Sequence, residues 1–444
     1  MRKASSMAIA LILASNGLVA DDASEQELKE MLKRQAQQIE ALTKRLSQLE
    51  ASLPVLVNAT RKTVVAVEPK NKDNGMLAQH APAPMYAGAK KKSKYTVKPR
   101  GRVEFDTVVY DEEDGGRQYR EGSQFRRARL GVQGKLAGGF EYQIEADFAG
   151  GDKAKLDDTY LRYRINAKTA VTFGYHKVYH SLESATSDLN ATFMERHMVS
   201  NIFEVGAGGK MGASVLTGGS NWSGQFGVFA GSPNSGDKGK DGWGINGRLT
   251  WAPYLEEDRL IHLGIAAYYR NEDDDLLSIG DRPEIRRDSF KPFASGEFQA
   301  ESYNYVNAEF AGVAGPFSAQ FEYGRMSTSA TVGDRQFDGY SAQVGYFLTG
   351  ESLPYSAHKG AFGKLKPHKA LGAGGWGAFE LAARYSYVDL RDAASGSFGR
   401  NITLGVNWYP TANVRFMLNA VDFEAEGATD ESGRAYGVRT QVRW

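Results

Sequence analysis

Apolar and polar residues alternate with a period of two along most of the chain after residue 100. In residues 140–148 (FEYQIEADF), Phe, Tyr, Ile, Ala and Phe alternate with Glu, Gln, Glu and Asp. Residues 261–270, 379–387 and 436–444 repeat this scheme. The pattern predicts β-strands with one apolar and one polar face. Such strands occur in soluble sheets that cover a core, and in membrane barrels whose inner face meets water.

The composition of the polar face favours the membrane barrel. That face is rich in Gly, Glu, Asp, Arg, Asn and Gln, while Tyr, Phe and Trp mark the ends of the apolar face. Aromatic girdles that flank an apolar band around a polar lumen produce this pattern. We therefore expect an all-β fold, a transmembrane antiparallel β-barrel of about 16 strands, over residues 99–444.

The links between the strand segments differ in length. KLAGGFEY and YPTANVRF contain short turns, whereas residues 178–206, 272–300 and 349–375 form long links. Outer-membrane barrels have short periplasmic turns and longer external loops. The lengths therefore predict that the long links lie at the external end.

Residues 24–53 have a different period. Seam residues there are spaced alternately four and three apart, the heptad pattern of a coiled coil. Ser24 and Glu27 form a capping box, and Pro54 ends the helix. The seam residues are Leu28, Leu32, Gln35, Ile39, Leu42, Leu46, Leu49 and Leu53. A coiled coil over residues 21–53 is favoured over a helix that lies on a globular core, and the seam leaves two and three strands open.

The first 20 residues match a secretory signal peptide. Arg2 and Lys3 precede a short apolar stretch, and Ala20 is a suitable cleavage residue. Residues 54–98 combine polar, Pro/Ala-rich and Lys-rich tracts without a period, which indicates a linker. An exported chain whose strands cross a membrane is expected in the bacterial outer membrane. An even strand number places both barrel ends, and so the coiled coil, on the periplasmic side.

The composition argues against several functions. A net charge of +1 gives no field that attracts nucleic acid, and a chain without cysteine has no disulfide or thiolate metal site. His176 and His180 lack a third ligand, and the GxGxxG spacing in residues 372–377 precedes a strand, so no metal or other cofactor is expected. Ser181 and His180 are adjacent, which is poor geometry for a catalytic dyad, so we expect no enzyme. An outer-membrane hydrolase and a closed barrel that anchors the coiled coil are the alternatives.

Several tracts resemble the phosphate-selective porins O and P. They are SQFRRARLGVQG, LESATSDLNATFMERHM, YFLTGESLPYS, GAFELAARYSYVDL and TLGVNWYP, together with the closing strand. The resemblance covers roughly residues 99–444. It implies a homotrimer of outer-membrane porins, each a water-filled channel for passive diffusion of small hydrophilic solutes and ions. It also implies a third loop folded inward, an arginine-lined lumen and a preference for anions or phosphate.

The resemblance also assigns positions in the pore. Arg102, the pair Arg126 and Arg127, Arg196 and Arg282 match arginines of the family, and Asp157 matches an acidic residue near the constriction. Alternation adds further lumen residues, and places Asp158 rather than Asp157 on the lumen face. The expected pore residues are Arg102, Arg127, Arg129, Asp157, Ser184, Glu195, Arg196, Arg282 and Arg384.

Two features of these positions bear on selectivity. Ser184 stands where phosphate-selective members place a lysine, and the third loop is acidic, so we expect only a weak anion preference. Alternation puts Arg126 on the face opposite Arg127 and Arg129, which indicates a rim or a bulge near this pair.

The last residue, Trp444, lies on the apolar face of the closing strand. A terminal aromatic residue resembles the signal that the outer-membrane assembly machinery reads. The expected partners are therefore further copies of the chain, this machinery, outer-membrane lipid and lipopolysaccharide, and small solutes or inorganic anions. No nucleic acid is expected.

Overall fold

The computed structural model describes residues 95–112, 117–149, 151, 153–232, 242–271, 276–331, 333–427 and 430–444. The predicted signal peptide, coiled coil and most of the linker therefore lie outside the described residues. No helix in the described part of the chain is long and apolar enough to cross a membrane.

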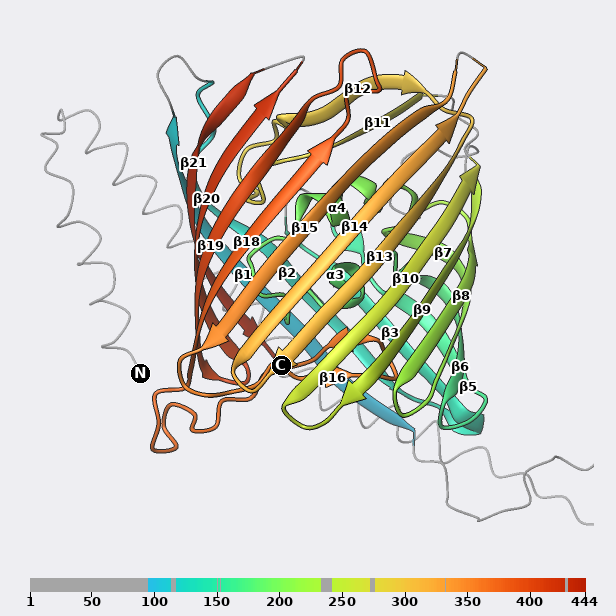
Figure 1. Ribbon diagram of the computed structural model, residues 1–444. Helices are drawn as coiled ribbons and strands as arrows, with labels where there is room; N and C mark the ends of the chain where they lie inside the picture. The colour runs from blue at the N-terminus through green and yellow to red at the C-terminus, as the bar shows by residue number, and fades with distance from the viewer. Residues whose placement is uncertain are drawn as a thin grey trace, which may run out of the picture. The chain divides into compact units, whose positions relative to one another are not determined.

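Antiparallel strands form one closed barrel (Figure 1). The main sheet has 17 strands, of which β4 (Lys155–Leu156) is a two-residue strand that pairs with β3. The other sixteen are β1 (Thr96–Glu112), β2 (Gly122–Lys135), β3 (Phe140–Asp147), β5 (Thr159–Arg164), β6 (Thr169–Lys177), β7 (Gly209–Gly218), β8 (Trp222–Phe229), β9 (Trp243–Leu255), β10 (Arg259–Asn271), β13 (Ser302–Ala314), β14 (Phe317–Ser329), β15 (Arg335–Phe347), β18 (Ala378–Asp389), β19 (Phe398–Thr411), β20 (Val414–Glu426) and β21 (Glu431–Arg443). Each pairs with the next, and β21 pairs with β1 from Arg102↔Arg443 onward, which closes the barrel. The predicted fold class is thus confirmed.

The two faces of the strands have the inverse of the burial found in a soluble protein. On the outer face, Leu263 and Val438 are 40% and 50% exposed. On the inner face, Asn407 and Arg439 are 0% and 1% exposed. An exposed apolar belt around a buried polar interior suits a barrel whose outer surface meets lipid.

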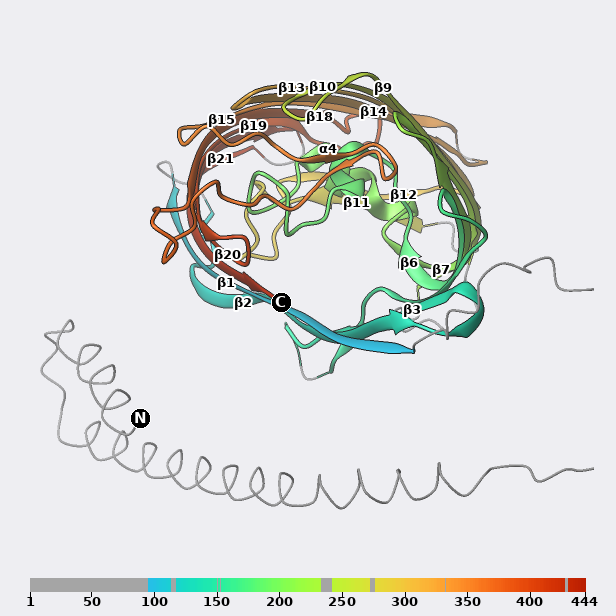
Figure 2. The ribbon, with the colours of Figure 1, turned by 90° about the horizontal axis from the view of Figure 1, so that it is seen from below.

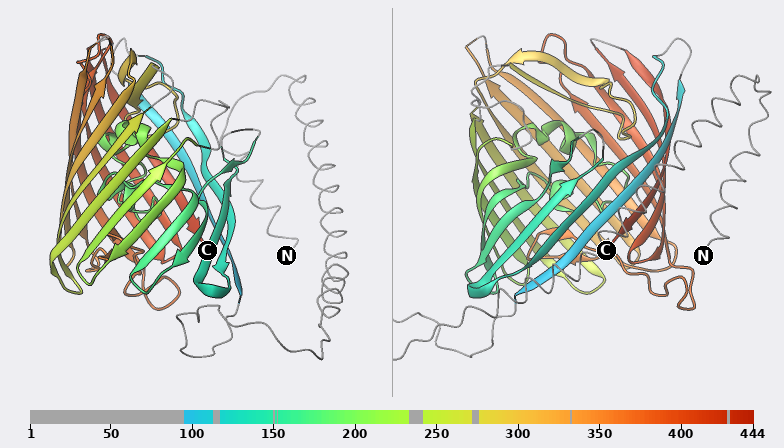
Figure 3. Two further views of the ribbon diagram at one scale, coloured as in Figure 1. Left: turned by 90° about the vertical axis from the view of Figure 1, so that its right-hand side faces the viewer. Right: turned by 180° about the vertical axis from the view of Figure 1, so that it is seen from behind.

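Three segments enter the barrel interior. The first, residues 178–208 between β6 and β7, is called loop L3; it contains α3 (Leu182–Ala185), α4 (Met198–Ile202) and the 3-10 helix η2 (Phe203–Gly206). The second contains the hairpin β11 (Leu276–Asp281) and β12 (Phe293–Gln299) between β10 and β13. The third, residues 348–377, contains β16 (Tyr355–Ser356) and β17 (Ala361–Phe362). Both panels of Figure 3 show the green helical part of L3 within the outline of the barrel.

The third segment lies at the end of the barrel where β1 begins and β21 ends, and not at the opposite end as its length suggests. Its Leu371 N–H donates to the carbonyl of Pro410, which lies near the end of β19, next to the short turn between β19 and β20. The same turn accepts a bond from Arg443, one residue before the chain ends. The prediction that all long links lie at the external end is therefore wrong, because length alone does not record the direction of the preceding strand.

An apolar cluster fills one side of the lumen. It joins buried side chains of L3, the β11–β12 segment and the inner faces of β10 to β20. Its members include Met198, Val199, Ile202, Phe203, Tyr268, Phe293, Phe298, Tyr303, Tyr305, Phe337, Val388 and Phe423. Figure 2 shows α4, β11 and β12 within the ring of strands. We call the β10–β20 wall the filled side and the β1–β7 wall the open side.

Candidate functional site: the open side of the lumen

Arginines on the closing strands hold loop L3 by its backbone carbonyls. Arg415 donates to the carbonyls of Ala191 and Thr192, each at 2.6 Å. Arg439 donates to the carbonyl of Met194 and pairs with Asp106 at 2.7 and 2.8 Å. The loop is irregular, so its buried carbonyls have no strand partner and need donors from the wall. These arginines position the loop. The alternation of the sequence in β20 and β21 predicts only that they face inward, and does not reveal their contact with the loop.

Arg384 is part of this support and does not face open lumen. Its side chain is fully buried, and its Nε donates to Glu284 at 2.8 Å. A second nitrogen donates to the carbonyl of Glu195 at 3.1 Å, and the guanidinium lies over the ring of Phe193. Alternation places Arg384 on the inner face correctly, but L3 and the hairpin segment cover that part of the wall.

A β-bulge turns two consecutive arginines of β2 into the lumen. The pairing of β1 with β2 shifts register between Glu104, opposite Arg127, and Phe105, opposite Phe125, which leaves Arg126 unpaired in the ladder. Arg126 therefore points inward and binds Glu195 of L3 at 2.7 and 2.9 Å. This is the bulge that the alternation of the sequence indicated.

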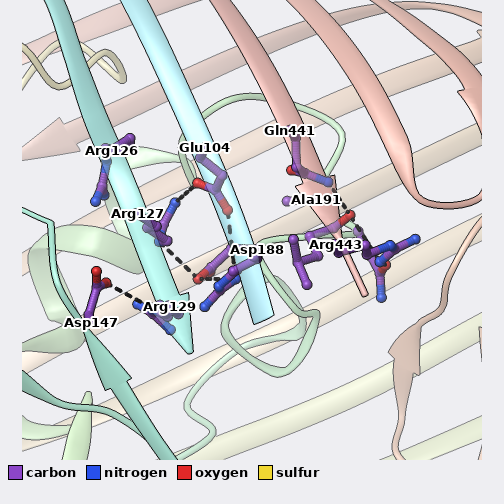
Figure 4. A network of polar contacts seen from close by, with 12 residues as sticks. Glu104, Arg126, Arg127, Arg129, Asp147, Asp188, Ala191, Gln441 and Arg443 are labelled. Carbon is purple, nitrogen blue, oxygen red and sulfur yellow. Dashed lines mark hydrogen bonds and ion pairs between the residues drawn. The ribbon is translucent and has the colours of Figure 1, made fainter. Parts of the chain in front are cut away.

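The remaining arginines of β1 and β2 join a network of carboxylates (Figure 4). Arg127 pairs with Glu104, and Arg129 pairs with Asp147 at 2.8 Å and also with Asp157. Asp157 lies 3.9 Å from Arg102. The chain breaks its strand between β4 and β5 at Asp157, so simple alternation through this point does not hold.

Ser184 differs from its predicted place. It lies on α3, where its Oγ accepts bonds from the N–H groups of His180 and Ser181. Its own N–H donates to Ser181 Oγ, which completes a capping box. The residue is 4% exposed, so it has no access to the open lumen. The short helix buries its cap, which a residue count along the loop does not reveal.

The other predicted residues lie along the edge of the open side. Glu195 binds Arg126, Arg439 at 2.8 Å and Arg286 at 3.2 Å. Arg196 pairs with Asp188 and lies 3.8 Å from Glu204. Arg282 donates from Nε to the carbonyl of Asp288 at 2.7 Å. Sequence reasoning missed Arg286 and Arg439, although inward alternation of β21 pointed to the second.

A cavity of about 550 Å³ lies on the open side, beside the N-terminal part of β2. Its charged lining residues are the cations Arg126, Arg129, Lys155, Arg282, Arg286 and Arg287 and the carboxylates Asp147, Asp157 and Asp288. Six cations against three carboxylates leave three positive charges in excess. A site with this balance attracts anions over about 8 to 10 Å at physiological salt.

Two carboxylates of L3, Asp188 and Glu195, stay charged. Burial by itself raises the pKa of Asp188, but Arg196, Lys177 and Arg127 together hold that pKa well below its ordinary value. Burial opposes Arg126 and Arg439 at Glu195 in the same way, and the pKa of Glu195 is also well below its ordinary value. Their ion pairs therefore stabilise the docked loop above the ordinary carboxylate pKa and weaken only as the pH falls toward the lowered values.

Among the residues that the structure describes, one buried group has the composition of a metal site, namely Glu183, His197 and Glu322. His197 Nδ1 accepts a bond from the Ser200 N–H, so the ring proton lies on Nε2, which faces Glu322 at 3.2 Å. A protonated Nε2 donates to the carboxylate and cannot bind a cation. Glu322 also accepts the N–H groups of Leu182 and Glu183. The group thus anchors α3 to the wall.

A closed sixteen-stranded barrel with a loop folded into a charged lumen defines an outer-membrane porin. The chain belongs to the phosphate-selective porin O and P family, whose model matches residues 97–444. It is 29% identical over 430 residues to an uncharacterised protein of Caulobacter vibrioides, and the alignment covers 88% of this chain and 85% of that protein. It is 26% identical over 354 residues to Porin O of Pseudomonas aeruginosa, and the alignment covers 70% of this chain and 78% of that protein.

Solved structures share the fold at low identity. An anion-selective porin from Comamonas acidovorans superposes with a TM-score of 0.54 at 13% identity, over 79% of this chain and 100% of that chain. OmpT, an outer membrane protein of Vibrio cholerae, superposes with a TM-score of 0.52 at 12% identity, over 81% of this chain and 100% of that chain. The protein is therefore an outer-membrane porin that forms a channel for small hydrophilic solutes.

Proposed function

We propose that this porin prefers small inorganic anions, that the preference is weak, and that its solutes pass along the open side of the lumen. The observation that carries this proposal is the excess of three positive charges in the lining of the cavity beside β2. The family is described as phosphate-selective, which agrees with an anion preference. The preference is weak because most arginines are already paired with carboxylates, so they attract anions without offering several free donors at one place.

The geometry gives no support to a hydrolase. Ser181 caps α3 with its hydroxyl and is 0% exposed. His180 bonds through Nε2 to the carbonyl of Ser200 and is 1% exposed. Neither side chain can meet a substrate from the lumen, which favours a channel without catalytic function.

A homotrimer accounts for the low wall of the barrel around β3 and β5. β5 has 6 residues, which at about 3.3 Å per residue and a tilt near 45° span only about 14 Å of the roughly 25 Å apolar band. Among the described residues, β2 pairs with β3 only from Arg129 to Lys135. The N-terminal part of β2 therefore has no neighbouring strand on that edge. Unsatisfied strand edges do not face lipid. Further copies of the chain would cover this wall.

The end of the barrel where β1 begins and β21 ends would face the periplasm. This orientation places the predicted coiled coil of residues 21–53 and the linker of residues 54–98 in the periplasm, after removal of the signal peptide. Association of the coiled-coil helices of several copies would assist assembly of the trimer. Outer-membrane lipid, lipopolysaccharide and the assembly machinery are the other partners of this arrangement.

Reversal potentials in planar bilayers under a potassium chloride gradient test the selectivity. We expect the wild type to prefer chloride weakly and Arg129→Gln to shift the reversal potential toward potassium, because the lining then has five cations against three carboxylates. The variant removes one cation and leaves Asp147 and Asp157 without their close partner, so two uncompensated carboxylates face the cavity. The control is Arg434→Gln, because Arg434 is 54% exposed in its side chain at a strand end and should leave the potential unchanged. A strongly cation-selective wild type would refute the proposal.

A further inference from the structure

Four cations converge on one carboxylate at the tip of L3. Asp188 Oδ2 lies 3.6 Å from Arg102 and 3.5 Å from Arg127. Its Oδ1 lies 3.8 Å from Lys177 and also pairs with Arg196. The cations come from β1, β2, β6 and L3 itself, so elements far apart in sequence supply them.

Other carboxylates satisfy these cations only in part. Glu104 binds Arg127 and lies 3.7 Å from Arg102. Within the described part of the chain, Lys177 forms an ion pair with Asp188 alone. Without Asp188, Lys177 would lose its partner, and three guanidinium groups would keep donors without acceptors.

This cluster borders the open side. The side chain of Lys177 is 23% exposed, whereas Asp188 is 9% exposed and is enclosed by its partners. Two residues that line the cavity adjoin this cluster: Asp157 lies 3.9 Å from Arg102, and Arg129 is opposite Arg102 in the pairing of β1 with β2. Figure 4 shows Arg129 near Arg127 and Asp188. An anion that moves down the open side therefore passes this cluster.

A ring of guanidinium and ammonium donors around two oxygens is the arrangement that binds an oxyanion. We propose that Asp188 is a tethered anion that occupies an oxyanion-binding site of this porin and so prevents inorganic phosphate from binding there. The proposal rests on the anion pathway proposed above and explains its weak selectivity. The loop carries its own carboxylate into the place where a free phosphate would otherwise displace water and bind several donors.

The test compares Asp188→Ser with Asp147→Ser. Both variants remove one carboxylate of the same lumen and raise the net charge by one, but Asp147 pairs only with Arg129 among the described residues. Phosphate binding is measured on the purified, detergent-solubilised porin by calorimetry and by the phosphate-dependent rise in its melting temperature. Phosphate block of chloride current is measured in bilayers.

We expect Asp188→Ser to bind phosphate with saturation, at a half-saturating concentration at least tenfold below that of Asp147→Ser or the wild type. Asp188→Asn, which removes the charge but keeps the volume, should bind phosphate more weakly than Asp188→Ser. Equal binding by Asp188→Ser and Asp147→Ser would overturn the proposal. A noisier, larger conductance without saturable binding would also overturn it, since that result shows that Asp188 only fastens the loop.

Phosphate binding is measured on the solubilised porin, so its result does not depend on the ion selectivity of the channel. A cation-selective wild type would therefore refute the anion pathway, whereas the absence of phosphate binding in Asp188→Ser would refute the tethered anion separately.

Discussion

Arg384→Met should release loop L3 from the filled side and give a larger, noisier single-channel conductance. The substitution keeps most of the side-chain volume but leaves Glu284 as a buried carboxylate without its cation. Removing one partner of a buried ion pair costs about 3–5 kcal/mol. Ladder hydrogen bonds hold the strands independently of the loop, so this cost falls on the docking of L3 and the hairpin segment.

Glu284 makes this position sensitive for a second reason. It has φ 53°, the only positive φ of a residue other than glycine among the described residues. Its carboxylate also accepts bonds from Met198 N–H and Thr403 Oγ1, each at 2.8–2.9 Å. Such a conformation persists only where surrounding contacts fix it.

Two further variants control this experiment. Arg400→Met removes an arginine whose side chain is 34% exposed and whose pairs with Asp422 and Glu424 lie at the end of the barrel, and it should not change conductance. Arg384→Met combined with Glu284→Gln removes both buried charges and should restore part of the quiet conductance. An unchanged trace for Arg384→Met alone would contradict the role assigned to this pair.

Trp444→Ser should reduce the amount of porin in the outer membrane to a small fraction of the wild-type amount. Trp444 and Gly101 exchange backbone hydrogen bonds at 3.1 and 3.3 Å where the barrel closes, and the indole lies directly over the α-carbon of Gly101. The ring is 53% exposed on the outer face, where aromatic residues mark the membrane boundary. Immunoblots of outer-membrane fractions, with heat-modifiable mobility as a sign of folding, measure the effect.

Trp376→Ser is the matched control for Trp444→Ser. Trp376 is more exposed, at 76%, but lies in residues 348–377 and takes no part in closing the barrel. We expect normal levels of this variant. Equal losses for both tryptophans would show that assembly depends on surface aromatics in general, and normal levels of Trp444→Ser with altered conductance would contradict an assembly role.

The strands could be predicted because their signal is local. Alternation in β3, β10, β18 and β21 assigns each residue to a face, and the burial of these strands agrees with that assignment. The bulge at Arg126 was indicated because two adjacent arginines cannot share one face of a regular strand. At Asp157 the strand is interrupted, and the period of two no longer carries information across the break.

The pathway could not be predicted in the same way, because it depends on contacts between distant segments. Inward orientation does not mean contact with water: Arg384 and Arg439 face inward and are covered by L3. Ser184 lies at the expected place in the sequence of L3, but a capping box turns it away from the lumen. The end of the barrel at which residues 348–377 lie depends on the direction of β15. That direction follows only from counting every strand before it.

The position of the pathway is the central claim, and accessibility of single cysteines tests it most directly. The chain has no cysteine, so an introduced thiol is unique. Ser289 lines the cavity on the open side, whereas Ser386 on the inner face of β18 is 0% exposed beneath the filled side. During a bilayer recording, an anionic thiol reagent should modify Ser289→Cys and lower the chloride current. Ser386→Cys should stay unmodified. Rapid modification and block of Ser386→Cys, with no effect on Ser289→Cys, would contradict the account.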